Sequence, residues 1–241
     1  MAAQFDELMR LETAADADGA TGVGLLAVSR TGNFPKCDFD IMSACSKEDL
    51  GAPYMLNCYG RRTTISDETV DEQSAFWIYS ITKTLTAISM LQCVQRREIS
   101  LDDEVYLHLP ELKQLPIVSL GEGGQMSFTP HTKGITVRHL LSHTSGIGMD
   151  LFDPRLQAWR MSREEIPRAL CGKSKEAYTT PLLFEPGEGW AYGGGAEWAG
   201  ILVERLTELK LEETMKKYIF DPLGMNSSTF HPAKVRILRG V

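Results

Sequence analysis

The chain has 241 residues, of which 43% are hydrophobic and 24% are charged, so it is long enough to bury the core of one large globular domain. Its formal net charge at pH 7 is −7, and no cluster of Lys and Arg interrupts this acidic balance. Because contact with nucleic-acid phosphates needs a basic surface, the composition argues against a nucleic-acid partner.

The chain carries no apolar run that approaches the roughly 20 residues of a membrane-spanning helix. It begins with MAAQFDELMRLETAADADGAT, which is acidic and amphipathic, whereas a signal peptide has a basic start and a continuous apolar stretch. The five cysteines are scattered and form no CxxC pair, which favours reduced thiols. Together these features predict a cytoplasmic protein with no membrane partner.

Apolar residues at helical spacing predict a helix from Phe5 to Ala14, and the apolar run GVGLLAVS that follows predicts a buried strand. Residues 31–53 show an irregular pattern. The segment YMLNCYGRRT then predicts a second strand, antiparallel to the first.

The clearest helical pattern of the chain runs from Ser80 to about Arg97. Its apolar positions recur at steps of three and four residues, at Ile81, Leu85, Ile88, Leu91 and Val94. After this helix, SLDDEVYLHLPEL predicts a turn with a short extended stretch, and GEGGQ predicts a flexible loop. The segment TVRHLLSHTSG predicts a short helix that Gly146 ends.

Residues 148–189 are typical of a loop-rich region. Two further helices are predicted, over Ala196–Leu209 and Leu211–Tyr218. The first of these would bury one side, formed by Trp198, Ile201, Leu202 and Leu206. No internal repeat is visible.

The segment FWIYSITKTLT places a serine, Ser80, three residues before a lysine, Lys83. A serine hydroxyl is a weak nucleophile until a base takes its proton, and a lysine is such a base only when its pKa is depressed. Residues three apart share one face of a helix, and the free N–H groups at a helix N-terminus can stabilise an oxyanion. The apolar neighbours that we expect to bury the lysine and lower its pKa are Phe76, Trp77, Ile78 and Ile81.

The same four residues have a structural interpretation. Serine is a preferred helix N-cap, and a lysine in the first turn is ordinarily solvated. A four-residue Ser-x-x-Lys pattern also arises by chance in a chain of this size, so the pattern alone does not decide whether Ser80 is a nucleophile.

Three separated blocks of the chain occur in an order and spacing that are typical of one known family. They read YSITKTLTAISMLQCVQRREISLDDEVYLHLPEL, GITVRHLLSHTSGI and FEPGEGWAYGGGAEWAGILVERLTELKLEETMKKYIFDPLGMNSSTF. Together they cover most of residues 70–230 and resemble the serine beta-lactamase-related family, which includes class C beta-lactamases, DD-peptidases and family VIII-type esterases. Within it, the chain is most similar to fungal transesterases of polyketide pathways, of the lovastatin acyltransferase type.

The resemblance implies a fold and a set of catalytic residues. The implied fold is α+β, an α/β sandwich of the beta-lactamase/transpeptidase type with an antiparallel sheet flanked by helices and a mostly helical region. The implied catalytic residues are Ser80 as the acylated nucleophile, Lys83 as its activating partner, and Tyr192 of the block WAYGGG. The resemblance leaves open whether Lys83 or Tyr192 is the base, and it implies no cofactor and no metal.

Gly194 stands where beta-lactamases have the Asn of their Tyr-x-Asn motif. A glycine cannot offer a side chain to a substrate amide, so the resemblance favours an ester or thioester substrate over a beta-lactam.

The block HLLSHTSG raises two other possibilities. His139 and His143 are four apart on the predicted short helix, but the Glu of a His-Glu-x-x-His zinc site is missing, and the resemblance treats the block as scaffold. Ser145 does not lie in a Gly-x-Ser-x-Gly motif, so a Ser-His-Asp hydrolase is the weaker enzyme hypothesis.

The family's third motif, on a late inner strand, has no counterpart in the chain, which ends at HPAKVRILRGV. We therefore expect one beta-lactamase-like domain over residues 1–241 that is incomplete at its C-terminus and lacks sheet strands. Residues 1–75 would hold the N-terminal helix and strands, and residues 76–230 the mostly helical region.

The resulting hypothesis is a serine esterase or acyltransferase that acts through an acyl-Ser80 intermediate on an ester or thioester, in fungal secondary metabolism. Its partners would be a small acyl donor and an alcohol acceptor, while the oligomeric state stays open. The alternative is a catalytically impaired, truncated homologue that serves as a binding module. A beta-lactam-binding, DD-peptidase-like protein is the third hypothesis.

Overall fold

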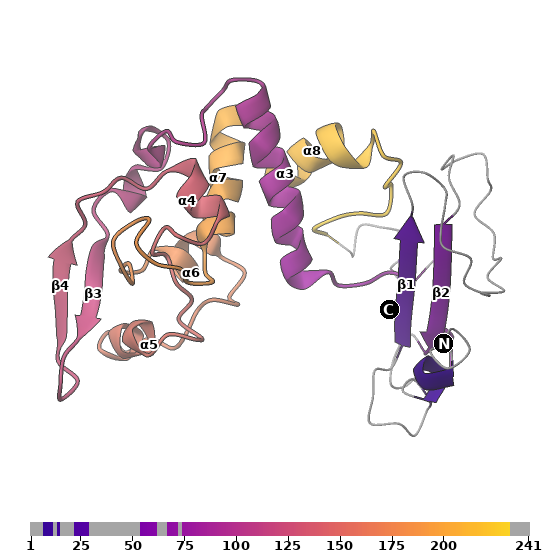
Figure 1. Cartoon of the computed structure of the whole chain (residues 1–241), viewed down its shortest axis with the longest axis horizontal. Coiled ribbons are helices and arrows are strands. Elements are labelled where there is room, and N and C mark those ends of the chain that lie inside the picture. Colours follow the sequence, from indigo (N-terminus) through magenta and orange to yellow (C-terminus); the bar gives the residue numbers. More distant parts are fainter. Residues whose placement is uncertain are drawn as a thin grey trace. The chain divides into compact units, whose positions relative to one another are not determined.

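The computed structural model describes residues 7–11, 14, 22–28, 54–61, 67–71 and 74–231 (Figure 1). The chain divides into two compact units, Met1–Trp77 and Ile78–Val241. The expectation of a single domain over residues 1–241 stays a prediction.

The first unit contains an antiparallel pair of strands, β1 (Gly22–Val28) and β2 (Tyr54–Gly60). The register pairs Gly22 with Gly60 and Val28 with Tyr54. Both strands and their antiparallel pairing are confirmed. Residues 7–11 are helical, whereas the other residues of the helix predicted over Phe5–Ala14, except Ala14, lie outside the described residues, as does the irregular segment 31–53.

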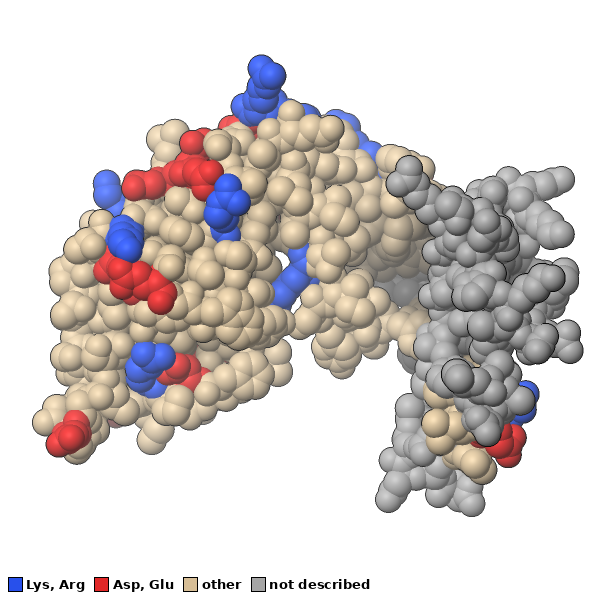
Figure 2. All heavy atoms as spheres, in the orientation of Figure 1, with Lys and Arg blue, Asp and Glu red and all other residues tan. Residues whose placement is uncertain are grey.

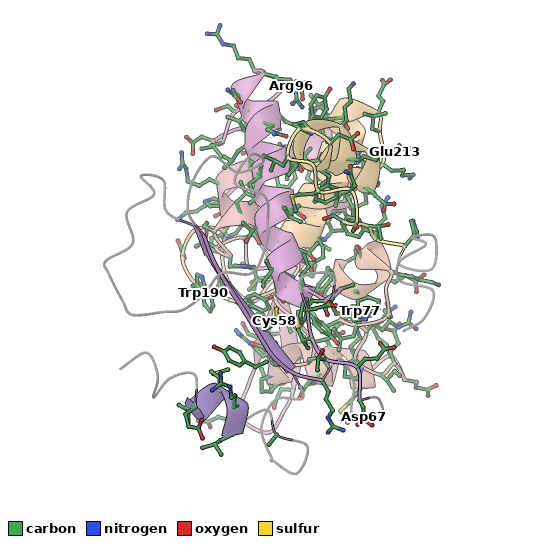
Figure 3. The ribbon with its side chains drawn as sticks, turned by 90° about the vertical axis from the view of Figure 1, so that its right-hand side faces the viewer. Cys58, Asp67, Trp77, Arg96, Trp190 and Glu213 are labelled. Atoms are coloured by element: carbon green, nitrogen blue, oxygen red, sulfur yellow. The ribbon has the colours of Figure 1, made fainter. Side chains whose placement is uncertain are left out.

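The second unit is built around two helices that pack against each other, α3 (Thr82–Gln95) and α7 (Gly195–Thr207). The short helix α8 (Leu211–Met215) packs against both and continues as a π-helical turn, η4 (Lys216–Phe220). Figure 3 shows α3 lengthwise, with Arg96 at its C-terminal end. The helices predicted over Ser80–Arg97, Ala196–Leu209 and Leu211–Tyr218 are therefore present, with boundaries shifted by a few residues.

The core of the second unit forms where α3, α7 and the short helix α4 (Val137–Leu141) meet. Trp198 of α7 is fully buried, and its indole Nε1 donates a hydrogen bond to the carbonyl oxygen of Tyr178 at 3.0 Å. This bond removes the cost of burying the indole N–H. Other fully buried side chains of this core are Met90, Cys93, Leu140 and Leu202.

A β-hairpin of the second unit was not predicted. It consists of β3 (Pro116–Leu120) and β4 (Met126–Pro130), joined by the loop that the sequence does indicate. Gly123 and Gly124 have φ values of +89° and +83°, which suit glycine in a tight connection. The strands show no clear alternation of apolar and polar residues, because only Val118 is fully buried, and this explains why the pattern was weak.

Other segments differ from the sequence prediction in detail. The stretch predicted as extended forms two 3-10 helices, η2 (Val105–Leu107) and η3 (Pro110–Leu112). Helix α4 ends at Leu141, well before Gly146. The loop-rich region 148–189 includes the helices α5 (Pro154–Met161) and α6 (Ser174–Tyr178).

Pro110 and Pro154 each lie at the start of a helix, where the missing proline N–H costs nothing.

Charges of both signs are intermixed on the face of the second unit that Figure 2 shows. Exposed ion pairs of this unit include Arg138 with Asp102 and Lys133 with Glu188. Within the part of the chain that the structure describes, no helix is long and apolar enough to cross a membrane.

A buried ion pair holds the loop-rich region together. Arg160 of α5 donates to Asp150 at 2.9 Å, and both side chains are almost completely buried. Asp150 also accepts from the backbone N–H groups of Arg168 and Ala169, while Arg160 donates to the carbonyl oxygens of Glu176 and Ala177. The pair thus ties α6 to α5 and to the segment just before α6, which includes Ala169 of the cavity wall described below.

We expect Arg160→Leu to destabilise the protein by about 3–5 kcal/mol, because it leaves the Asp150 carboxylate buried without its charge partner. Chemical denaturation monitored by circular dichroism measures this change. Lys133→Ala is the control, since its ion pair is exposed and its unfolding midpoint should match that of the wild type. Equal midpoints for Arg160→Leu and the control would contradict this role.

Candidate active site

The structure brings Ser80 and Tyr192 together although they lie 112 positions apart in the sequence. The phenol Oη of Tyr192 donates a hydrogen bond to the Oγ of Ser80 at 2.6 Å. Ser80 lies in a 3-10 turn, η1 (Tyr79–Ile81), directly before α3. No side chain caps the start of either η1 or α3, so the Ser80 hydroxyl is not an N-cap.

The backbone is strained immediately before Ser80. Tyr79 has a φ of +42°, a region that residues with a side chain rarely occupy and that costs about 1–3 kcal/mol. Such strain recurs where a fold must fix one side chain. Here it accompanies the turn that presents Ser80 ahead of α3.

Lys83, in the first turn of α3, forms an ion pair with Glu197 of α7. The distance between Lys83 Nζ and Glu197 Oε1 is 2.7 Å, and each side chain keeps only about a fifth of its surface exposed, 20% and 23%. The same ammonium lies 5.3 Å from the ring centroid of Tyr192. One cation therefore contacts both the glutamate of the facing helix and the tyrosine that is hydrogen-bonded to Ser80.

The expected depression of the Lys83 pKa is wrong. Burial does push the pKa down, but the hydrogen bond and charge of Glu197, assisted by Tyr192, outweigh it and raise the pKa above its ordinary value. The neighbours that were expected to bury this lysine are all exposed, namely Phe76, Trp77, Ile78 and Ile81. No local pattern places an acidic side chain opposite Lys83, and the carboxylate of Glu197 reverses the shift of its pKa.

His143 packs against the ring of Tyr192. The two ring centroids are 4.8 Å apart, and the Nδ1 of His143 accepts a long hydrogen bond, 3.5 Å, from the backbone N–H of Gly193. Burial, followed by the nearby charge of Lys83, lowers the pKa of His143 below its ordinary value. A neutral imidazole therefore supports the turn that carries Tyr192.

His139 and His143 do not share a helix face, because α4 ends at Leu141 and His143 has a φ of +61° beyond it. His139 instead completes a capping box with Thr136, in which each residue's backbone N–H donates to the side chain of the other. Among the described residues, no cluster of three or more His, Cys, Asp or Glu could hold a metal ion.

The glycine run after Tyr192 permits close packing. A Cβ atom on Gly193 would overlap the carbonyl oxygen of Ile147, and one on Gly194 would overlap the ring of Tyr178. Tyr178 is buried, and its hydroxyl donates to the carbonyl oxygen of Ala169 at 3.0 Å. The place where beta-lactamases carry an asparagine is thus closed by an aromatic ring.

A cavity of about 430 Å³ lies beside Ser80 and Lys83. Its polar lining includes Ser80, Lys83, Glu197 and Glu204. The apolar part of the wall comes largely from Met149, Leu170, Ile201, Leu211 and Phe230. The arrangement can therefore hold an apolar group with its reactive end at the Ser80 hydroxyl.

The three residues named from the sequence, Ser80, Lys83 and Tyr192, lie in one cluster, and the structure adds Glu197 and His143. A signal for Glu197 does exist in the sequence. It is the one acidic residue within the otherwise buried run Gly195–Gly200 of α7, and a carboxylate in such a run needs a partner.

Comparison with protein families gives one match, to the family described as Beta-lactamase, over residues 51–240. The chain is 37% identical over 202 residues to the lovastatin esterase of Penicillium rubens, an alignment that covers 81% of this chain and 50% of that protein. It is 34% identical over 179 residues to the monacolin J acid methylbutanoyltransferase of Aspergillus terreus, covering 72% and 43%. The chain thus spans about half the length of these relatives.

Among solved structures, the chain is similar to unliganded simvastatin synthase (LovD) from Aspergillus terreus. The TM-score is 0.69 at 30% identity, with 79% of this chain and 50% of that chain covered. The fold is therefore of the beta-lactamase type, in agreement with the sequence prediction.

We expect Gly194→Asn to destabilise the protein by about 1–3 kcal/mol, because the new side chain must displace the buried ring of Tyr178. Thermal unfolding measures the effect. Gly121→Ala is the matched control, since a Cβ there meets only ordinary van der Waals contacts. A Gly194→Asn variant as stable as this control would show that the site has room for the asparagine.

We expect His143 to make stability pH-dependent. Its pKa is lower in the folded chain than its ordinary value of 6.5, so stability is complete above pH 6.5 and falls as the pH drops from there toward the folded pKa. Denaturation curves between pH 5 and 8 should show this loss in the wild type and in His108→Gln, and a smaller loss in His143→Gln. Identical pH profiles for all three proteins would refute the assignment.

Proposed function

The chain belongs to the beta-lactamase family, and from this membership and the site geometry we propose that it is a serine esterase or acyltransferase that works through an acyl-Ser80 intermediate. The observation that carries the proposal is the 2.6 Å hydrogen bond between Tyr192 and Ser80, with the Lys83 ammonium beside the same tyrosine. A nucleophile, a proton acceptor and a positive charge are the parts that acyl transfer requires.

In the proposed reaction, Tyr192 first releases its phenol proton to solvent, so that the hydrogen bond reverses and the Ser80 hydroxyl donates to the phenolate. Ser80 Oγ then forms a bond to the acyl carbon of the donor while its proton moves to the phenolate oxygen of Tyr192. The bond from the acyl carbon to the leaving alkoxide or thiolate then breaks, and Tyr192 returns the proton to this leaving group. Water or an acceptor alcohol next attacks the Ser80 ester, gives its proton to Tyr192 and takes the acyl group. Ser80 regains its proton from Tyr192, so atoms and charges balance over the cycle.

Tyr192, and not Lys83, is the base in this proposal. The raised pKa of Lys83, with Glu197 as its partner, supports an ammonium at neutral pH, and an ammonium cannot accept a proton. It does stabilise negative charge on a neighbouring phenolate oxygen. The pair is best regarded as one coupled unit.

For the substrates we propose an apolar acyl donor, an ester or thioester, and an alcohol acceptor. The relatives named as an esterase and a methylbutanoyltransferase support this class, as does the apolar wall of the cavity beside Ser80. A role in fungal secondary metabolism is proposed on the same similarity. The closed space at Gly194 argues against recognition of a beta-lactam amide by a side chain at this position.

The test is covalent labelling with a fluorophosphonate probe, followed by mass spectrometry to locate the adduct. We expect one adduct on Ser80 in the wild type and none at this position in Ser80→Ala. Tyr192→Phe should label about 10²–10⁴-fold more slowly, because it removes the proton acceptor.

Two controls separate this mechanism from its alternatives. Tyr218→Phe removes a phenol elsewhere in the unit and should label at the wild-type rate. Ser145→Ala tests the weaker Ser-His-Asp hypothesis, in which loss of this serine would abolish labelling. Folded wild-type protein that takes no label at Ser80 would rule out the proposed function.

A further inference from the structure

We infer that Glu197 is a positioning residue of the site: it holds Lys83 at the side of Tyr192, and reactivity of Ser80 depends on its carboxylate. The inference rests on the proposed function, since it concerns the same acylation step. Glu197 itself contacts Lys83 and not Ser80, so it would act through the lysine.

The two carboxylate oxygens of Glu197 have different surroundings. Oε1 accepts the hydrogen bond from Lys83 Nζ at 2.7 Å. Oε2 is buried and has no hydrogen-bond partner among the described residues. A buried carboxylate with one unsatisfied oxygen is costly, and here its compensation comes from one lysine, which ties the state of Glu197 closely to Lys83.

The ion pair also fixes the distance between two helices. Lys83 is in the first turn of α3 and Glu197 in the first turn of α7, and α7 begins three residues after Tyr192. The pair therefore joins the segment that carries Ser80 to the one that carries Tyr192. A substrate-sized cavity opens beside it.

Other charged and titratable groups that face Lys83 or its partner do not replace Glu197. Tyr192 raises the pKa of Lys83 less than Glu197 does, and His143 is held neutral in part by the lysine itself. Tyr178, whose pKa is raised by burial and by Glu197, is not ionised near neutral pH. Glu204 lines the same cavity, but its Oε1 accepts from the backbone N–H of Leu211.

The test compares the pH dependence of Ser80 labelling by the fluorophosphonate in the wild type and in Glu197→Gln. The glutamine keeps the shape but loses the charge, so burial is left to lower the pKa of Lys83. We expect labelling at neutral pH to slow at least tenfold and its alkaline limit to move to lower pH by about one unit or more.

Glu208→Gln is the matched control, because it removes the same charge from the exposed C-terminal cap of α7. It should leave both the rate and the pH profile unchanged. A Glu197→Gln protein that labels at the wild-type rate with an unshifted profile would overturn the inference. Faster labelling would also overturn it, since this would mean that a neutral Lys83 is the reactive form.

Glu197→Asp keeps the test decisive if the glutamine variant does not fold. It retains the charge on a shorter side chain, so we expect slower labelling with an alkaline limit near that of the wild type. If Glu197→Asp labelled at the wild-type rate, the placement of the carboxylate against Lys83 would not matter for the reactivity of Ser80. Absence of Ser80 labelling in the wild type would instead overturn the proposed function, and the role of Glu197 with it.

Discussion

An ion pair between Lys83 of α3 and Glu197 of α7 joins the two helices on which the candidate site is built. Lys83 also lies beside the ring of Tyr192, whose phenol is hydrogen-bonded to Ser80. A shift of α3 against α7 would therefore break the contact between the lysine and the glutamate and separate Ser80 from Tyr192. The proposed chemistry depends on the distance between Ser80 Oγ and Tyr192 Oη, because proton transfer requires hydrogen-bond contact between these two hydroxyl groups.

The residues packed around Tyr192 also hold it beside Ser80. The glycines after Tyr192 let the chain pass so close to Ile147 and Tyr178 that any side chain would collide. His143 packs against the ring of Tyr192, and its lowered pKa favours a neutral imidazole, which avoids a second positive charge near Lys83. These contacts fix the tyrosine by packing, while the ion pair supplies the charge.

Helices with a strong apolar period leave local signals, so the sequence predicted much of the fold. Ser80 and Lys83 were singled out by their spacing, and Tyr192 was named through the resemblance to a known family; the structure brings the three together. Glu197 was missed: its place in an otherwise buried run of α7 signals that it needs a partner, but nothing local shows that the partner is Lys83, 114 positions away. For the same reason the direction of the Lys83 pKa was wrong: the prediction considered its neighbours in sequence, which are exposed, and not its neighbour in space. The β3–β4 hairpin was missed because it buries little and so shows no alternation.

The central claim is that Lys83 is an ammonium held by Glu197, and the most direct measurement is its titration. Lysine labelled with ¹³C at Cε gives one NMR signal for each side chain, and the signal of Lys83 is identified by its loss in Lys83→Arg. The account predicts that this signal titrates above the ordinary lysine value of 10.5. A midpoint below that value would contradict it, because Lys83 would then be a candidate base and Tyr192 would lose the charge that the proposed mechanism places beside it.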